Sequence, residues 1–116
     1  LRSRALERSG LFKEALKELE TLQETPETLA LKGALYWRLG KPEEAKVASE
    51  RALEGEMEAR AEALNTLGLL ARSKGDHRNA EAFARRAASL WRSLGYQSRL
   101  ADALSNLAAA RALQNE

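Results

Sequence analysis

His77 is the only histidine of this 116-residue chain, and imidazole is the side chain best suited to move a proton near neutral pH. It directly follows Asp76, so the two residues could belong to a nucleophilic triad or a metal site. Both kinds of site need further partners, and the sequence has no cysteine, no paired-histidine spacing and no glycine-rich phosphate loop. We therefore expect no catalytic residue, no bound metal and no cofactor, and interpret His77 as a solvated turn residue.

Two pairs of adjacent residues with like charge could bind a substrate or a phosphate, but each is also explained by its place in a helix. Glu43 and Glu44 follow Pro42, a pattern typical of the first turn of a helix, where carboxylates face the positive end of the helix dipole. Arg85 and Arg86 lie among strong helix formers, and we expect them to face solvent rather than to bind phosphate. The leucines and alanines at helical spacing indicate a core, not a cofactor-binding surface.

The elements that position these residues are expected to be helices. The chain has no isoleucine, a single valine and four threonines, whereas alanine, leucine, glutamate and arginine are abundant. Strands depend on β-branched residues to fill a pleated surface, and the abundant residues are the strongest helix formers. The composition therefore predicts an all-α fold.

Charge and hydropathy limit the partners that we expect. A net charge of +2 is too small to indicate nucleic-acid binding on its own. The chain has no run of about 18 apolar residues that would span a membrane, and no pattern of a secretory signal. With no cysteine present, we expect a cytoplasmic protein that binds neither membrane nor nucleic acid.

Small residues recur along the chain at intervals that lengthen from 30 to 35 and then to 40 residues. Four of them reappear 35 residues later: Gly33, Gly40, Ala45 and Ala52 correspond to Gly68, Gly75, Ala80 and Ala87. The segment 62–76 also aligns without a gap to the segment 102–116. In each unit a glycine can end one helix in the left-handed conformation, and a helix-start signal follows it.

These signals predict seven helices in chain order. We place them at residues of about 1–9, 11–23, 26–39, 42–54, 57–74, 77–94 and 97–114. Gly10 would form the first turn, Thr25 would cap the third helix ahead of Pro26, and Asp76 would cap the sixth.

The pattern resembles the tetratricopeptide repeat family. One unit carries Leu29, Gly33, Tyr36, Gly40, Ala45 and Ala52, and the next carries Leu64, Leu67, Gly68, Gly75, Ala80, Ala84 and Ala87. The resemblance covers essentially the whole chain and implies a right-handed superhelix of antiparallel helical hairpins, an α-solenoid. It divides the chain into a partial repeat 1–24, repeats 25–59 and 60–96, and a partial repeat 97–116.

The resemblance implies a protein- or peptide-binding domain. The long last repeat, around residues 89–107, is similar to repeats of bacterial transcriptional regulators and adaptor scaffolds. Because the chain begins with Leu1 and its end units look incomplete, we expect an excerpt of a larger bacterial protein. The alternative is a structural module that self-associates through these ends, where Leu100, Leu104, Leu107 and Ala108 would be exposed.

In such a superhelix the first helix of each unit lines a concave groove. The register assigns eight residues to this peptide-binding groove: Arg4, Arg8, Trp37, Arg38, Asn65, Leu69, Arg72 and Asn106. Arginines pair with carboxylates, and asparagines can bind a peptide backbone, so the expected partner is an acidic or extended segment. Two alternatives stay open, because the arginines can instead offset helix dipoles and Trp37 can instead pack between repeats.

Overall fold

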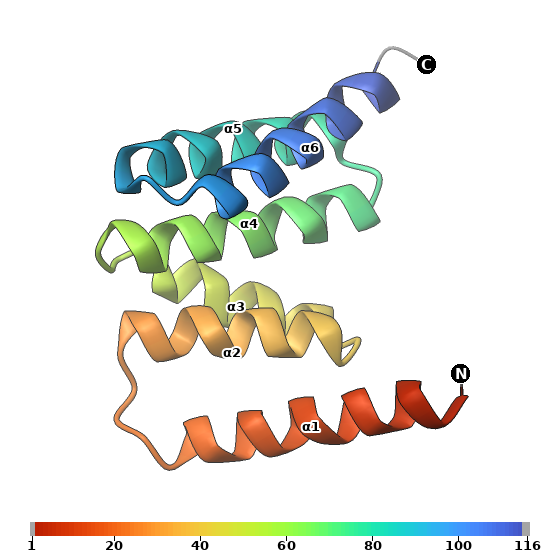
Figure 1. Cartoon of the computed structure of the whole chain (residues 1–116), viewed down its shortest axis with the longest axis vertical. Helices are drawn as coiled ribbons and strands as arrows, with labels where there is room; N and C mark the ends of the chain where they lie inside the picture. Colours follow the sequence, from red (N-terminus) through yellow and green to blue (C-terminus); the bar gives the residue numbers. More distant parts are fainter. Residues whose placement is uncertain (1, 115–116) are drawn as a thin grey trace.

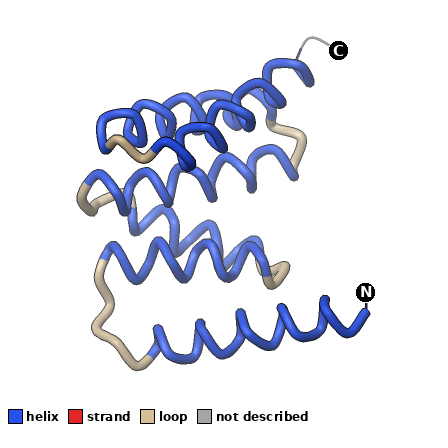
Figure 2. Tube along the Cα trace, viewed as in Figure 1, coloured by secondary structure: helices blue, strands red, loops and turns tan. Residues whose placement is uncertain are grey.

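The computed structural model describes the backbone of residues 2–114 and the side chains of residues 8–114. This part of the chain is all helical, as predicted, and contains no strand (Figures 1 and 2). The helices are α1 (Arg2–Glu20), α2 (Pro26–Arg38), α3 (Pro42–Ala52), α4 (Met57–Ser73), α5 (His77–Leu94) and α6 (Gln97–Gln114). In Figure 1 they stack in chain order, with α2, α4 and α6 in front of α3 and α5.

The turn predicted at Gly10 is wrong, because residues 2–20 form the single helix α1. Gly10 does not have a positive φ, unlike Gly40 and Gly75 with φ of 73° and 79°. Those two glycines are followed by helix starts at Pro42 and Asp76, whereas Leu11 and Phe12 after Gly10 offer no cap. One glycine inside a helix lowers the stability of the helix by only about 1 kcal/mol relative to alanine. The strong helix formers on both sides of Gly10 are therefore sufficient to continue the helix.

The other helix boundaries fall within a few residues of the predicted ones, and their caps explain why. The hydroxyl of Thr25 accepts a hydrogen bond from the backbone N–H of Thr28 at 3.2 Å, and the hydroxyl of Thr28 accepts one from Thr25 at 2.9 Å. Pro42 occupies the first turn of α3. Asp76 accepts a hydrogen bond from the N–H of Asn79 at 3.3 Å and thereby caps α5.

Small residues allow the two helices of each hairpin to approach closely. Ala45 and Ala52 of α3 and Ala87 of α5 are completely buried, and so is Ser49. At Gly33 of α2, an added β-carbon would lie 2.4 Å from Ser49 Oγ and 3.3 Å from its backbone nitrogen. Glycine is therefore favoured at this crossing, because a methyl group would displace the Ser49 side chain and crowd the backbone of α3.

Trp91 forms the centre of the core between α4, α5 and α6. It is 1% exposed, and its cluster includes Ala61, Leu64, Ala87, Ala88 and Ala103. Tyr96 stacks on its ring with centroids 5.6 Å apart, and the Arg99 guanidinium lies 5.6 Å from the ring centroid. The alanines bring the helices close, and the indole fills the space that remains.

Arg99 also pairs with Glu62 of α4 at 2.8 Å, at the edge of this core. Burial raises the pKa of the Glu62 carboxyl above its ordinary value, although the attraction of Arg99 opposes this shift. Nearby, the hydroxyl of Tyr96 donates a hydrogen bond to Glu58 at 3.2 Å. These contacts hold the start of α6 against α4.

The helix α1 contacts the rest of the molecule least. Among its described side chains only Leu16 is buried, whereas Leu11 is 63% exposed. It packs against α2 alone (Figure 1). None of the described helices is long and apolar enough to cross a bilayer.

Candidate functional site

Four of the eight predicted groove residues line one notch between α4 and α6. Asn65, Leu69 and Arg72 follow one another at helical spacing on α4, and Asn106 faces them from α6. The side-chain amide of Asn106 donates a hydrogen bond to the side-chain oxygen of Asn65 at 3.3 Å. The two amides thereby join the first helices of successive repeats.

The floor of this notch consists of small residues. Gly68 of α4 lies there with Ala80 and Ala84 of α5, and the enclosed volume is only about 10 Å³. Such a volume is about that of one water molecule and is too small for a side chain. The notch can therefore offer polar groups to a backbone that lies across it, but it cannot bury an anchor residue.

Arg72 gives this surface its charge. Its side chain is exposed in the last turn of α4, and no carboxylate of the described residues lies within 4 Å of its guanidinium. No acidic residue lines the notch. A free guanidinium beside two amides is suited to a carboxylate on an extended chain, which arginine can hold with two parallel hydrogen bonds.

Trp37 and Arg38 of α2 do not line this notch between α4 and α6. Trp37 is half-buried and packs against the cluster of Ala45, Leu67 and Leu70, between the two repeats. The Arg38 guanidinium is exposed and lies 5.4 Å from the centroid of the Phe12 ring of α1.

Two groove residues of α1 complete the predicted set. Arg8 is exposed, and the structure gives it no contact with the notch. The side chain of Arg4 lies outside the described residues.

His77 is not the fully solvated residue that the sequence suggested. It is half-buried at the first position of α5, and its Nδ1 atom is covered without a hydrogen-bond partner among the described residues. The side chain of Gln114, near the end of α6, approaches the His77 carbonyl oxygen at 3.5 Å. Within residues 8–114 no three histidine, aspartate or glutamate side chains gather as a metal site would require.

Comparison with known families identifies the repeating unit. The tetratricopeptide repeat model matches residues 26–54 and 61–90, which correspond to the hairpins α2–α3 and α4–α5. The chain belongs to the tetratricopeptide repeat family. Tetratricopeptide repeats generally mediate protein–protein interaction, so binding of a protein is the expected role of the fold. Neither the curated proteins nor the solved structures gave a match to the chain.

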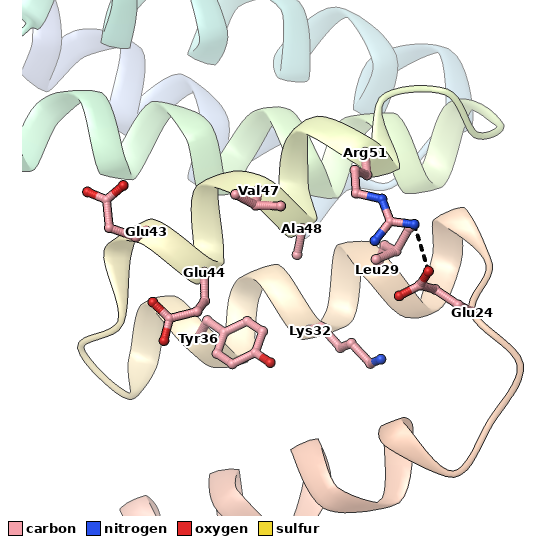
Figure 3. A pocket seen from close by; sticks show the side chains of 9 residues that line it. All are labelled: Glu24, Leu29, Lys32, Tyr36, Glu43, Glu44, Val47, Ala48 and Arg51. Carbon is pink, nitrogen blue, oxygen red and sulfur yellow. Dashed lines mark hydrogen bonds and ion pairs between the residues drawn. The ribbon is translucent and has the colours of Figure 1, made fainter.

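A larger hollow, which the sequence analysis missed, lies between α2 and α3 of the first matched repeat (Figure 3). Its volume is about 350 Å³, and Leu29, Tyr36, Val47 and Ala48 form its apolar part. Within the sequence, the signal is at Ala48: 35 residues later the same place in the next repeat holds Phe83. A small residue in place of a large one leaves space between two helices.

Proposed function

We propose that this chain is a protein-binding tetratricopeptide repeat domain that holds an acidic, extended segment of its partner across α4 and α6. The observation that carries this proposal is the Asn65–Asn106 amide pair beside the unpaired guanidinium of Arg72. Both amides are half-buried and keep hydrogen-bonding capacity beyond their mutual contact. The partner backbone would bind these amides, and a partner carboxylate would bind Arg72.

The proposed role of Arg72 is tested by Arg72→Glu. A carboxylate at this position would repel the acidic segment, and we expect at least tenfold weaker binding of the best acidic peptide selected from a random peptide library. Fluorescence anisotropy at about 150 mM salt measures this, because salt at that concentration screens attraction that depends only on net charge. Arg92→Glu is the matched control, since Arg92 is also exposed in the last turn of a helix. Equal losses in the two variants would contradict a site at Arg72.

The proposal also covers the location of the protein and the larger chain to which the repeats would belong. We infer a cytoplasmic bacterial protein in which the repeats belong to a longer regulatory or adaptor chain. The support is the similarity of residues 89–107 to the long repeats of bacterial transcriptional regulators and adaptor scaffolds. The predicted groove residues of α1 and α2 would then bind a partner separately from the notch.

Self-association is the second candidate function, and one observation favours it. Leu104 of α6 is 41% exposed, whereas Leu64, which aligns with it in α4, is 1% exposed because α5 covers it. If α6 pairs with a second copy through this face, sedimentation velocity at high concentration will show a dimer or larger species that Leu104→Glu converts to monomer. A wild-type chain that stays monomeric at millimolar concentration excludes this function.

A further inference from the structure

The hollow between α2 and α3 can be compared with the same place in the next repeat. A shift of 35 residues carries Lys32 to Leu67 and Ala48 to Phe83. Leu67 and Phe83 line a hollow of about 200 Å³, against about 350 Å³ here, which Lys46 and Glu50 of α3 also border. The second repeat therefore has a phenyl ring, with side chains of α3 beside it, at the place where the first matched repeat has only the methyl group of Ala48.

The larger hollow is apolar between its ends. Ala48 and Leu29 form its base and are 6% and 7% exposed, whereas Val47 at its wall is 56% exposed. Its volume lies at the lower end of the range of small-ligand sites, which is roughly 300–1,000 Å³. A side chain the size of phenylalanine can enter it and remove the exposed apolar surface from water.

The two ends of the hollow carry opposite charge. Figure 3 shows Glu43 and Glu44 at one end, and Lys32, Arg51 and Glu24 at the other. No cation of the described residues lies within 4 Å of either carboxylate at the first end.

At the second end Arg51 is bound to an acid and Lys32 is not. Arg51 binds Glu24 at 2.6 Å and lowers the pKa of this carboxyl through the hydrogen bond and its charge, and the charge of Glu54 also acts on Arg51. No carboxylate of the described residues lies within 4 Å of the Lys32 ammonium group, so Lys32 is the base at this end that has no ion pair. The first end, in contrast, keeps two negative charges, so the hollow has an acidic and a basic end with an apolar floor between them.

The spacing of these ends fixes the length of the segment that fits. Eight residues of α3 separate Glu43 from Arg51, which at about 1.5 Å per residue is about 12 Å along the helix. An extended chain of about four residues covers that distance. The basic residue of such a segment would face Glu43 and Glu44, and its acidic residue would lie at the end that holds Arg51 and Lys32.

We propose that this hollow is a second protein-docking site, which takes a short extended segment with an aromatic side chain between one acidic and one basic residue. The aromatic ring would occupy the space above Ala48, as Phe83 does in the next repeat. The site is separate from the notch at Asn65 and Arg72, because it lies between α2 and α3. Its occupation therefore does not depend on the function proposed for that notch.

The probe is the capped peptide Asp-Ala-Phe-Ala-Lys, titrated into the isotope-labelled 116-residue chain and followed by amide NMR shifts. We expect the largest shifts at Val47, Ala48 and Tyr36, and at least tenfold weaker binding when alanine replaces the phenylalanine of the peptide. Peptides with two acids or two bases around the phenylalanine are expected to bind more weakly than the mixed one. Shifts that fall instead on Asn65 and Arg72, or no saturable shifts, would overturn the proposal.

The variant Ala48→Phe tests the space itself. The added ring fills the hollow as Phe83 fills the next repeat, so binding of the probe should fall at least tenfold while the helical circular dichroism stays unchanged. Ala82→Phe is the matched control, because it places the same group at an exposed position of α5 outside the hollow. An equal loss in both variants, or no loss in Ala48→Phe, contradicts the proposal.

The double variant Glu43→Lys with Glu44→Lys tests whether the acidic end of the hollow selects the basic residue of the peptide. It also tests the proposal independently if Ala48→Phe does not fold. Reversing the acidic end should reverse the preference, so that the peptide with two acids binds better than the mixed peptide. Circular dichroism checks that α3 remains helical, since these carboxylates also face its dipole. An unchanged preference in the folded double variant overturns the charge assignment.

Discussion

Replacing Trp91 by alanine is expected to lower the free energy of unfolding by about 3–5 kcal/mol. The indole is 1% exposed, and four of the five other buried residues of its cluster are alanines, namely Ala61, Ala87, Ala88 and Ala103. These alanines cannot move side-chain atoms into the space that the ring leaves, and the larger side chains packed against the cluster would fill it only in part. The stacking of Tyr96 and the contact of Arg99 with the ring would be lost as well.

The control for this prediction is Trp37→Ala. Trp37 has the same side chain but is only half-buried between the repeats, so its removal should cost less than half as much. Urea unfolding followed by circular dichroism measures both, since the loss of a tryptophan would disturb a fluorescence readout. A loss of less than about 1.5 kcal/mol in Trp91→Ala would contradict the core described for α4, α5 and α6.

Gly33→Ala is expected to lower the free energy of unfolding by about 1–2 kcal/mol. Forcing a methyl group into the crossing of α2 and α3 costs about 1–3 kcal/mol, and the better helix propensity of alanine returns up to about 1 kcal/mol. The nearest atom is Ser49 Oγ at 2.4 Å from the added carbon, followed by two backbone atoms at 3.3 and 3.4 Å. Thermal and urea unfolding of the variant provide the measurement.

Two further substitutions separate this clash from a general effect of alanine. At Gly68 an added carbon would meet its nearest neighbour at 3.4 Å, so Gly68→Ala should be neutral or stabilise by up to about 1 kcal/mol. Ser49 Oγ is buried without a hydrogen-bond partner among the described residues, so Ser49→Ala costs little on its own. Combined with Gly33→Ala it should restore part of the lost stability. Strictly additive effects would show that the hydroxyl is not the obstacle.

The sequence was sufficient to predict the helices wherever local signals agree. Gly40 with Pro42, and Gly75 with Asp76, combine a helix end with a helix start, and the structure has turns at both places. At Gly10 only the first half of the signal is present, and the helix continues. Periodicity likewise placed Asn65 and Arg72 on one face of α4, because positions seven residues apart share a face of any helix.

The features that depend on packing between helices could not be predicted in the same way. Gly33 and Gly68 have the same place in their repeats, yet only Gly33 has no room for a methyl group, because Ser49 lies opposite it. The hollow above Ala48 depends on how α3 sits against α2, which no local pattern specifies. The packing of Trp37 between the repeats and the contact of Arg38 with the Phe12 ring depend on the neighbouring helices in the same way.

The central claim is that a protein segment binds across α4 and α6 at the notch. The most direct test follows the side-chain amide resonances of Asn65 and Asn106 by NMR while the best acidic library peptide is added. If the segment binds there, both resonances will shift in a saturable way, together with the backbone amides of Leu69 and Arg72, and Arg72→Glu will abolish these shifts. Saturable shifts confined to α3 and α5, with both asparagine side chains unmoved, would contradict it.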